Sequence, residues 1–488
     1  MRSSPSRSPL LPLLTAGFLV TLAASPASST GFTQSCFDVY GSPGHVVADF
    51  NSDGNVDVAL SPGTAAGTGF TTQALINVYL GDGLGSFTFA TQVATIGQVI
   101  WLAAADVNND GKLDLVNTGD YTGPFSINLG NGDGTFQAAY AVAGAGDDGL
   151  ALDDLNNDGY LDLLTGEDKE IAVQFNQGNG TFGAPVLYRI GLYPRGITTV
   201  DANGDGLRDI VAVALSNPGS PAIAFLPGQA GGTFGKLKKS NLSGSSYGGR
   251  HIETADFNGD GKLDVAVTRL QNGGVTVAFG NGAGAFSSSA NYPMPGFTNH
   301  LDVGDINGDG NLDIAAGSVG ANPSSPVGNV TVLYGNGSGG FSVGNVIGVS
   351  FGLGIALADA NEDGDLDIIE DTCVLLNDGT PAPAAMTRAV ATPGSATSAN
   401  LTASFSPNPT SGRGVLTFSL PKEGKVSIHL YDLRGRRVQT LANGTSMTAG
   451  RHTVEVDRRA ANLSTGMYFY RIETEAGQRS GRIVIATP

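Results

Sequence analysis

A nine-residue pattern, D-x-N-x-D-G-x-x-D, occurs seven times in this 488-residue chain and limits its fold more than any other feature. The copies begin at Asp49, Asp106, Asp154, Asp201, Asp256, Asp305 and Asp359, at intervals of 47–57 residues. Self-similarity at such a period indicates a propeller, a solenoid or another repeat array. Each unit is then one supersecondary element that buries its apolar face against its neighbours.

A glycine-rich turn that ends in phenylalanine follows six of the seven loops. Its glycines permit the positive φ angles of a tight hairpin. A large aromatic residue at one fixed repeat position predicts packing between neighbouring units. These residues are Phe87, Phe136, Phe182, Phe234, Phe286 and Phe341.

The segments between these motifs supply four short strands per unit. In the second unit they are "VIWLAAAD", "LDLVNT", "FSINLG" and "TFQAAYAVA". The acidic loop joins the first two strands and the glycine-rich turn joins the last two. Four antiparallel strands per repeat predict the blades of an all-β propeller, here with seven blades. A linear solenoid is the alternative.

The two chain ends of the repeat region favour a closed ring. The seventh unit stops after its third strand, "TCVLLNDGT", and "TGFTQSCFDVY" before the first loop supplies the missing fourth strand. Phe32 then takes the phenylalanine position. Aligning this composite unit on the second places Cys36 at Tyr140 and Cys373 at Ser126, which predicts a Cys36–Cys373 disulfide. Two buried free thiols are the alternative.

The loop resembles the start of an EF-hand, but position 12 of the second copy is Asn117 and a strand pattern follows it. Calcium prefers six to eight oxygen ligands. The side chains at positions 1, 3, 5 and 9 and the carbonyl of position 7 can provide them. Glu370, twelfth in the seventh loop, lies in a strand run, and Arg208 interrupts the apolar position 8 of the fourth loop.

The candidate calcium ligands are Asp49, Asn51, Asp53, Asn55 and Asp57; Asp106, Asn108, Asp110, Lys112 and Asp114; Asp154, Asn156, Asp158, Tyr160 and Asp162; Asp201, Asn203, Asp205, Leu207 and Asp209; Asp256, Asn258, Asp260, Lys262 and Asp264; Asp305, Asn307, Asp309, Asn311 and Asp313; and Asp359, Asn361, Asp363, Asp365 and Asp367. Asp/Asn turns without metal are the alternative. Three carboxylates in one short loop repel each other without a cation. Up to seven Ca²⁺ ions are expected.

Residues 31–400 carry 12 Lys and Arg against 38 Asp and Glu. This strongly acidic balance disfavours nucleic acid as a partner.

Over residues 31–380 the repeats resemble the FG-GAP/VCBS family, whose calcium-bearing repeats also form integrin α-subunit propellers. The resemblance implies a seven-bladed propeller with calcium on one face and, in integrin-like members, ligand binding on the other.

Composition divides the chain into four parts. Residues 1–29 have the basic start, apolar stretch and small residues of a secretory signal peptide. The propeller is expected at 30–380, with 31–41 closing the last blade, and a Pro/Ala/Ser/Thr-rich linker at 381–404. Residues 405–488 alternate as the short strands of a β-sandwich. Their motifs "SPNPTSG", "LYDLRGRRV" and "STGMYFYRIETEAGQRSGRIVI" resemble the type IX secretion sorting domain, related to FlgD Ig-like domains; an ordinary adhesive module is the alternative.

No nucleophile elbow, phosphate loop or zinc motif is present. Six residues before each loop the chain enters the expected innermost strand, opposite the metal face, and four consecutive units place polar groups there. The candidate ligand residues are Asp148, Tyr193, Arg195, Tyr247, Arg250, Asn299 and His300. Arg beside Tyr in a concave mouth suits a carboxylate or a sugar. Solvated loop ends are the alternative.

These features predict a secreted or surface-bound monomer that binds an extracellular glycan or protein and uses the secretion machinery through its C-terminal domain. We expect no membrane span and no nucleic-acid partner. The alternative function is a polysaccharide lyase that uses Tyr193, Arg195, Arg250 or His300.

Overall fold

The computed structural model describes residues 31–37, 44–62, 74–118, 124–145, 148–215, 221–242, 249–270, 273–320 and 328–377 of the repeat region. In the C-terminal region it describes 402–406, 413–420, 422–432, 437–448, 450–457, 466–474 and 477–485. The expected signal peptide, Tyr247 and nearly all of the linker lie outside these ranges. Every regular element within them is a strand, which confirms the all-β prediction. None of the described segments is a helix long and apolar enough to cross a membrane.

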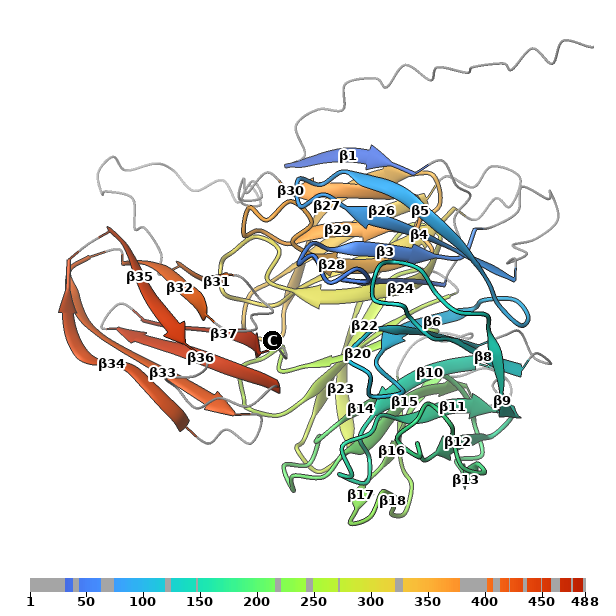
Figure 1. Cartoon of the computed structure of the whole chain (residues 1–488). Coiled ribbons are helices and arrows are strands. Elements are labelled where there is room, and N and C mark those ends of the chain that lie inside the picture. Colours follow the sequence, from blue (N-terminus) through green and yellow to red (C-terminus); the bar gives the residue numbers. More distant parts are fainter. Residues whose placement is uncertain are drawn as a thin grey trace, which may run out of the picture. The chain divides into compact units, whose positions relative to one another are not determined.

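Four-stranded antiparallel sheets repeat along residues 32–377 (Figure 1). The first three are β2–β5 (His45–Ala48, Asp57–Leu60, Leu75–Gly81, Phe87–Ala94), β6–β9 (Trp101–Ala105, Asp114–Thr118, Pro124–Asn128, Tyr140–Ala145) and β10–β13 (Asp148–Asp153, Asp162–Glu167, Glu170–Gln174, Val186–Arg189). The fourth contains β14 (Tyr193–Val200), β15 (Asp209–Leu215), β16 (Pro221–Leu226) and β19 (Lys238–Asn241), with a small hairpin of β17 (Gly228–Gln229) and β18 (Thr233–Phe234) at its glycine-rich turn.

The fifth sheet is β20–β23 (Ile252–Ala255, Asp264–Thr268, Val275–Gly280, Phe286–Tyr292) and the sixth is β24–β27 (Phe297–Gly304, Asp313–Val319, Gly328–Gly335, Phe341–Val349). The last contains β28 (Ile355–Ala358), β29 (Asp367–Glu370), β30 (Cys373–Asn377) and β1 (Phe32–Cys36). As predicted, each acidic loop joins the first strand of a sheet to the second, and each glycine-rich turn joins the third to the fourth.

The first strands of these sheets contact one another in sequence order. The contacts run from β2 through β6, β10, β14, β20 and β24 to β28, and β28 contacts β2 again. The sheets therefore form a closed ring and not a linear solenoid. The second and third strands lie in the core because they are continuous apolar runs, such as "DIVAVAL" in β15.

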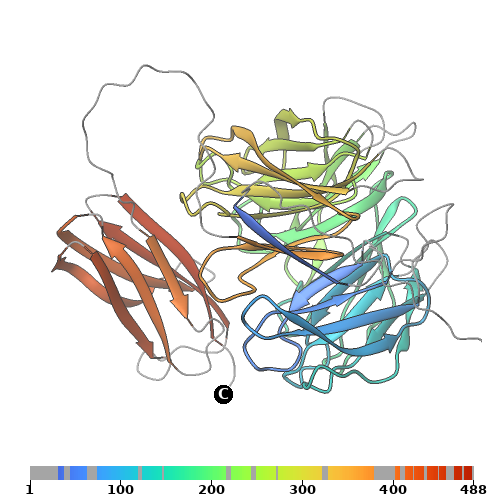
Figure 2. The same ribbon diagram turned by 90° about the horizontal axis from the view of Figure 1, so that it is seen from above.

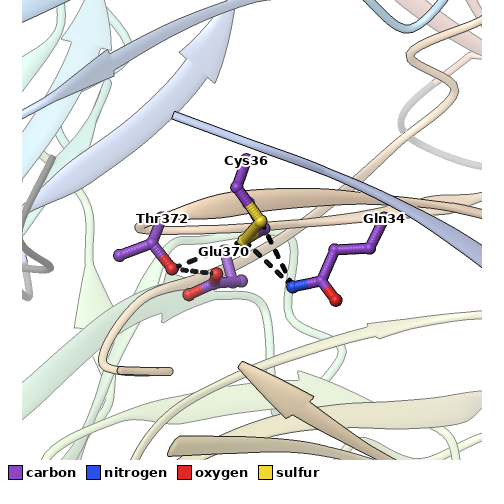
Figure 3. The surroundings of a disulfide bond; sticks show 5 residues. Gln34, Cys36, Glu370 and Thr372 are labelled. Atoms are coloured by element: carbon purple, nitrogen blue, oxygen red, sulfur yellow. Dashed lines mark hydrogen bonds between the residues drawn. A yellow bond between two sulfur atoms is a disulfide. The ribbon is translucent and has the colours of Figure 1, made fainter. Parts of the chain in front are cut away.

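The two ends of the ring meet in one sheet, as the sequence predicted. β1 pairs with β30, and Cys36 lies directly opposite Cys373 (Figure 1). A disulfide joins them, and the Gln34 amide Nε2 donates to both sulfurs (Figure 3). The alignment on the second sheet was wrong by one residue, because Ser126 there pairs with Ala141 and not with Tyr140. The register shift between Pro124 and Phe125 marks an irregularity in that strand pair.

Acidic loops are also attached to the following sheet, as the first and seventh loops show. The Phe136 ring lies edge-on to Phe50, the second residue of the first loop, with ring centroids 5.7 Å apart. The Gly134 N–H donates to the Phe50 carbonyl at 3.1 Å. Across the closure, the Gly85 N–H of the first sheet donates to the Ala360 carbonyl of the seventh loop at 3.1 Å. The predicted role of the repeated phenylalanines between units is thus seen directly in Phe136.

The C-terminal region has two sheets that share one hydrophobic core (Figure 2). One contains β31 (Thr402–Ser406), β32 (Arg413–Leu420) and β35 (Gly450–Asp457). The other contains β33 (Gly424–Asp432), β34 (Arg437–Met447), β36 (Gly466–Thr474) and β37 (Gly477–Ile485). The alternating segments "GVLTFSL", "KVSIHLYD", "RHTVEVD", "MYFYRIE" and "GRIVIA" predict β32, β33, β35, β36 and β37. They do not predict β31 and β34. β34 contains Gly444 with φ of 62°, a turn signal inside a strand.

Candidate metal loops and central cavity

The side-chain oxygens at positions 1, 3 and 5 of each acidic loop accept hydrogen bonds from backbone N–H groups of the same loop. In the second loop the Gly111 N–H donates to Asp106 Oδ2 at 2.7 Å, and the Asp110 N–H donates to Asn108 Oδ1 at 2.9 Å. The Lys112 N–H donates to Asp110 Oδ1 at 2.9 Å. All seven loops contain these three bonds. The repeated sequence therefore specifies a repeated loop conformation.

Two positions of the loop have left-handed backbone. Position 6 is the predicted glycine in every copy. Position 4 is glycine in three copies but Ser52, Asn109, Asn157 or Glu362 in the others, with φ between 57° and 61°. A non-glycine residue with positive φ is strained unless its surroundings hold it. Sequence reasoning missed this position, although three glycines mark it.

The aspartates at position 9 are fully buried: Asp57, Asp114, Asp162, Asp209, Asp264, Asp313 and Asp367. Asp114 Oδ2 accepts from the Val107 N–H at 3.0 Å, and its Oδ1 accepts from the Gly130 N–H at 2.8 Å. Burial, with a smaller contribution from the charges of Asp106 and Asp110, raises the pKa of Asp114 to about 6. This aspartate thus joins the loop to the end of the third strand, a role that the sequence did not indicate.

Within the described residues, no three His, Cys, Asp or Glu side chains lie close enough together to hold a metal ion. Each loop also offers oxygens of another kind, namely the asparagine amide at position 3 and the backbone carbonyl at position 7. In the second loop the Asn108 amide Nδ2 donates a hydrogen bond to Asp110 Oδ2 at 3.2 Å.

The residues expected at the mouth opposite the loops have different surroundings in the structure. Tyr193 is exposed, with Lys169 Nζ 5.2 Å from its ring centroid. Arg195 is half-buried, and Asp148 begins β10. Tyr247 lies outside the described residues, as does Pro43 of the same register. Arg250, Asn299 and His300 border a cavity of about 10 Å³, room for about one water molecule.

A larger cavity of about 680 Å³ lies among the first strands of the sheets. Its polar and aromatic lining includes His45, Trp101, His251, Glu253, His300 and Asp302, with Asp153, Thr199 and Arg208 elsewhere on its wall. Of these, the sequence analysis had singled out only His300 as a ligand candidate. The sequence does contain a signal for these residues, namely their fixed distance from the acidic loops. Trp101, His251 and His300 lie five residues before the first aspartate of a loop, and Glu253 and Asp302 lie three residues before it.

Aromatic rings fill one end of this cavity. The centroids of His251 and His300 are 3.6 Å apart. Trp101, from the second sheet, stacks on His251, from the fifth, with centroids 5.7 Å apart. His45 meets His300 edge-on at 5.2 Å. Burial, with a contribution from neighbouring His45, lowers the pKa of His251 to about 3, and burial also places the pKa of His300 well below its usual value. Because both pKa values lie below neutral pH, the imidazoles of His251 and His300 are neutral at pH 7.

Two carboxyl groups lie beside the rings. Glu253 Oε1 is 3.9 Å from His251 Nε2, and Asp302 Oδ2 accepts from the Leu357 N–H at 2.8 Å. Burial, followed by the charge of Asp302, raises the pKa of Glu253 to about 8. The Glu253 side chain is 35% exposed, and it lines this cavity.

At the end next to the acidic loops, Arg208 Nε lies 3.0 Å from Asp153 Oδ2, and the Thr199 hydroxyl donates to the same oxygen at 2.7 Å. Arg208 is the position-8 residue that interrupts the apolar pattern of the fourth loop. Its side chain is 40% exposed and lines this end of the cavity, which is open to solvent. The fourth loop nevertheless keeps the hydrogen bonds of the others.

Comparison with known proteins bears on the fold and on the C-terminal region. Residues 404–486 match the secretion system C-terminal sorting domain. This match indicates export and an extracellular or cell-surface location. A search among curated proteins found no match.

Several solved structures are similar at low identity. One is a lectin of Agrocybe aegerita that recognises non-reducing terminal N-acetylglucosamine (21% identity, 70% of this chain and 87% of that one, TM-score 0.43). Another is the biofilm matrix protein Bap1 of V. cholerae (14% identity, 92% and 67%, TM-score 0.35). A third is a candidate 6-phosphogluconolactonase of Bacteroides fragilis (14% identity, 65% and 87%, TM-score 0.46).

The repeat region matches a family model five times in overlapping register. The matched segments are residues 49–117, 106–165, 154–212, 201–267 and 256–316, which together span more than half of the chain. Each begins at the first aspartate of an acidic loop and ends in the strand that directly follows the next acidic loop, which is the second strand of the next sheet. The chain therefore belongs to the FG-GAP-like repeat family.

Proposed function

We propose that this protein is an exported, calcium-stabilised, seven-bladed propeller that binds an extracellular glycan or protein. The acidic loops carry the proposal, because one conformation recurs in all seven with the same three hydrogen bonds. The closed contacts among the seven first strands support the blade number. The sorting domain accounts for export.

The donor chemistry of the loops fits calcium. In the second loop the ion would be held by Asp106, Asn108, Asp110, the Lys112 carbonyl and Asp114. Carboxylate, amide and carbonyl oxygens are the ligands that Ca²⁺ prefers. Burial raises the pKa of Asp114, and the charges of Asp106 and Asp110 raise it further, which supports the view that these carboxylates oppose one another's ionisation. A divalent cation would neutralise the carboxylates of the loop and stabilise the backbone turn to which the side chains at positions 1, 3 and 5 are hydrogen-bonded.

Calcium binding is tested by measuring bound ions and thermal stability together. Protein dialysed against EDTA and then against CaCl₂ is analysed for calcium per chain, and its Tm is compared in both states. We expect up to seven ions and a higher Tm with calcium, and a smaller effect of equimolar MgCl₂ because Mg²⁺ requires a stricter geometry. An unchanged Tm and no retained calcium would refute the proposal.

The second candidate function is a polysaccharide lyase. It would use Tyr193, Arg195, Arg250 or His300. His300 contacts the rings of His251 and His45, while Tyr193 is exposed beside Lys169. We favour binding over catalysis, because these contacts do not identify a base and an acid for β-elimination. Incubation with anionic polysaccharides distinguishes them: binding without new unsaturated chain ends supports our proposal, and turnover supports the lyase.

A further inference from the structure

We propose that the central cavity is a binding site for a small organic cation, an amine in its ammonium form, with Glu253 and Asp302 as its carboxylate partners and Trp101 on its wall. This site goes beyond the proposed function. Calcium in the loops, export through the sorting domain and recognition of an outer ligand could each fail without affecting it.

The cavity has the size and the access that such a ligand needs. Its volume of about 680 Å³ falls within the usual range of about 300–1,000 Å³ for small-molecule sites. The stacked rings of Trp101, His251 and His300 fill one end. Arg208 lies at the other end, and the cavity is open to solvent.

The charges around the cavity favour a cation. Among the described residues of its lining, Arg208 is the one Lys or Arg, and Asp153 binds it at 3.0 Å. Glu253 makes its ion-pair contact with His251, which burial keeps neutral. Two carboxyl groups therefore stand on adjacent first strands, and the contact that Glu253 makes there provides no positive charge. An ammonium group would supply that charge and let Glu253 ionise.

The lining also indicates which kind of cation fits. The indole of Trp101 and the two imidazoles offer an aromatic surface, and aromatic faces attract ammonium groups. The described His, Asp and Glu side chains do not converge as ligands around a metal ion. An organic cation uses these separated groups better than a metal ion does.

Trp101 is the only tryptophan in the chain, so intrinsic fluorescence reports on the cavity. The full exported chain, loaded with calcium, is titrated at constant ionic strength with cyclohexylammonium chloride and, in parallel, with cyclohexanol. The two probes share a ring and differ in charge. We expect a saturable change with the ammonium at least about tenfold tighter than with the alcohol. Equal affinities, or no saturable change with the ammonium, would overturn the proposal.

The pH dependence gives a second readout on the unaltered protein. The titratable or charged groups facing the site are Glu253, Asp302, His45, His251 and His300, with Asp153 and Arg208 at the loop end. Because the pKa of Glu253 is about 8, the ionised fraction that binds the ammonium rises about tenfold from pH 7 to pH 9. Ammonium affinity should rise by the same factor, and a flat profile would contradict the role of Glu253.

Variants complete the test. Glu253→Gln should remove the preference for the ammonium over the alcohol and the pH dependence, while Asp133→Asn, in an exposed glycine-rich turn, should keep both. Retention of both properties in Glu253→Gln would overturn the assignment. A parallel titration with ZnCl₂ covers the alternative: saturable quenching by Zn²⁺ but not by the ammonium would identify a metal site instead and refute the proposal.

Discussion

Cys36 of the first described strand faces Cys373 of the last strand of the ring, and their disulfide closes a sheet built from both ends of the repeat region. The bond spans 337 residues of sequence. In the chain-entropy model, a cross-link that closes a loop of that length stabilises the folded state by about 6 kcal/mol, less any strain.

The double variant Cys36→Ser/Cys373→Ser should therefore unfold at a clearly lower denaturant concentration than the parent protein. The measurement is the urea midpoint, with the parent protein in reductant as a matched control. A thiol assay on unfolded, unreduced exported protein should find no free thiol. Two free thiols per chain would contradict the disulfide.

A single acidic loop should lose its ion independently of the others. Asp110→Ala removes one side chain of the second loop and its bond to the Lys112 N–H. We expect about one calcium fewer per chain and a lower Tm in CaCl₂, with a smaller difference in EDTA. The control is Asp133→Ala, because Asp133 makes the same kind of bond to the Thr135 N–H in a glycine-rich turn. An unchanged calcium count for Asp110→Ala would exclude that loop as a site.

Asp114→Asn should destabilise the second sheet even without calcium. The buried carboxylate accepts N–H bonds from Val107 and Gly130, and an amide keeps only one accepting oxygen. A buried N–H that loses its partner costs about 1–3 kcal/mol. The check is the free energy of unfolding in EDTA. Equal stability of parent and variant would show that this bridge does not matter to the fold.

Glu253→Gln should stabilise the ligand-free protein in a defined pH range. The pKa of Glu253 is raised from 4.5 to about 8, so the unfolded chain releases this proton at lower pH than the folded chain. Folded-state stability thus falls as pH rises from about 4.5 to about 8, and glutamine removes this loss. The variant should have the higher Tm at pH 8 and the same Tm at pH 4.5. His251, with its pKa near 3, acts below pH 6.5 and is present in both proteins.

Deletion of residues 404–486, the matched sorting domain, should abolish export and leave the protein inside the cells that make it. Fractionation followed by immunoblotting measures this, with the parent chain as the control. The ring should still fold, because its first strands close on one another from β2 to β28. Unimpaired secretion of the truncated chain would instead assign residues 404–486 to adhesion.

Local pattern was sufficient to predict the repeated sheets, the loop conformation and the shared last sheet. The sheets and loops depend on residues close in sequence, such as Asp106 and Gly111 within one loop, whereas the shared last sheet was predicted because the first and last units are incomplete and complement each other. The central cavity depends on residues from different sheets. Trp101 and His251 stack because the ring brings β6 and the start of β20 together. Their common position five residues before a loop places them at one level of the ring but does not show that the two rings touch. The ligand residues predicted from the sequence lie six residues before each loop, with His300 among their neighbours.

The Cys36–Cys373 bond also has a mechanical consequence. The chain leaves the ring through β30, so any pull between a surface-held C-terminal domain and a captured ligand first loads that strand. Without a cross-link, such a force would peel β30 from β29 and β1 one residue at a time. The disulfide sits at Cys373, the first residue of β30, and stops the peeling there by passing the load covalently to β1. Peeling that starts at Asn377 therefore ends at Cys373, where β30 stays covalently joined to β1.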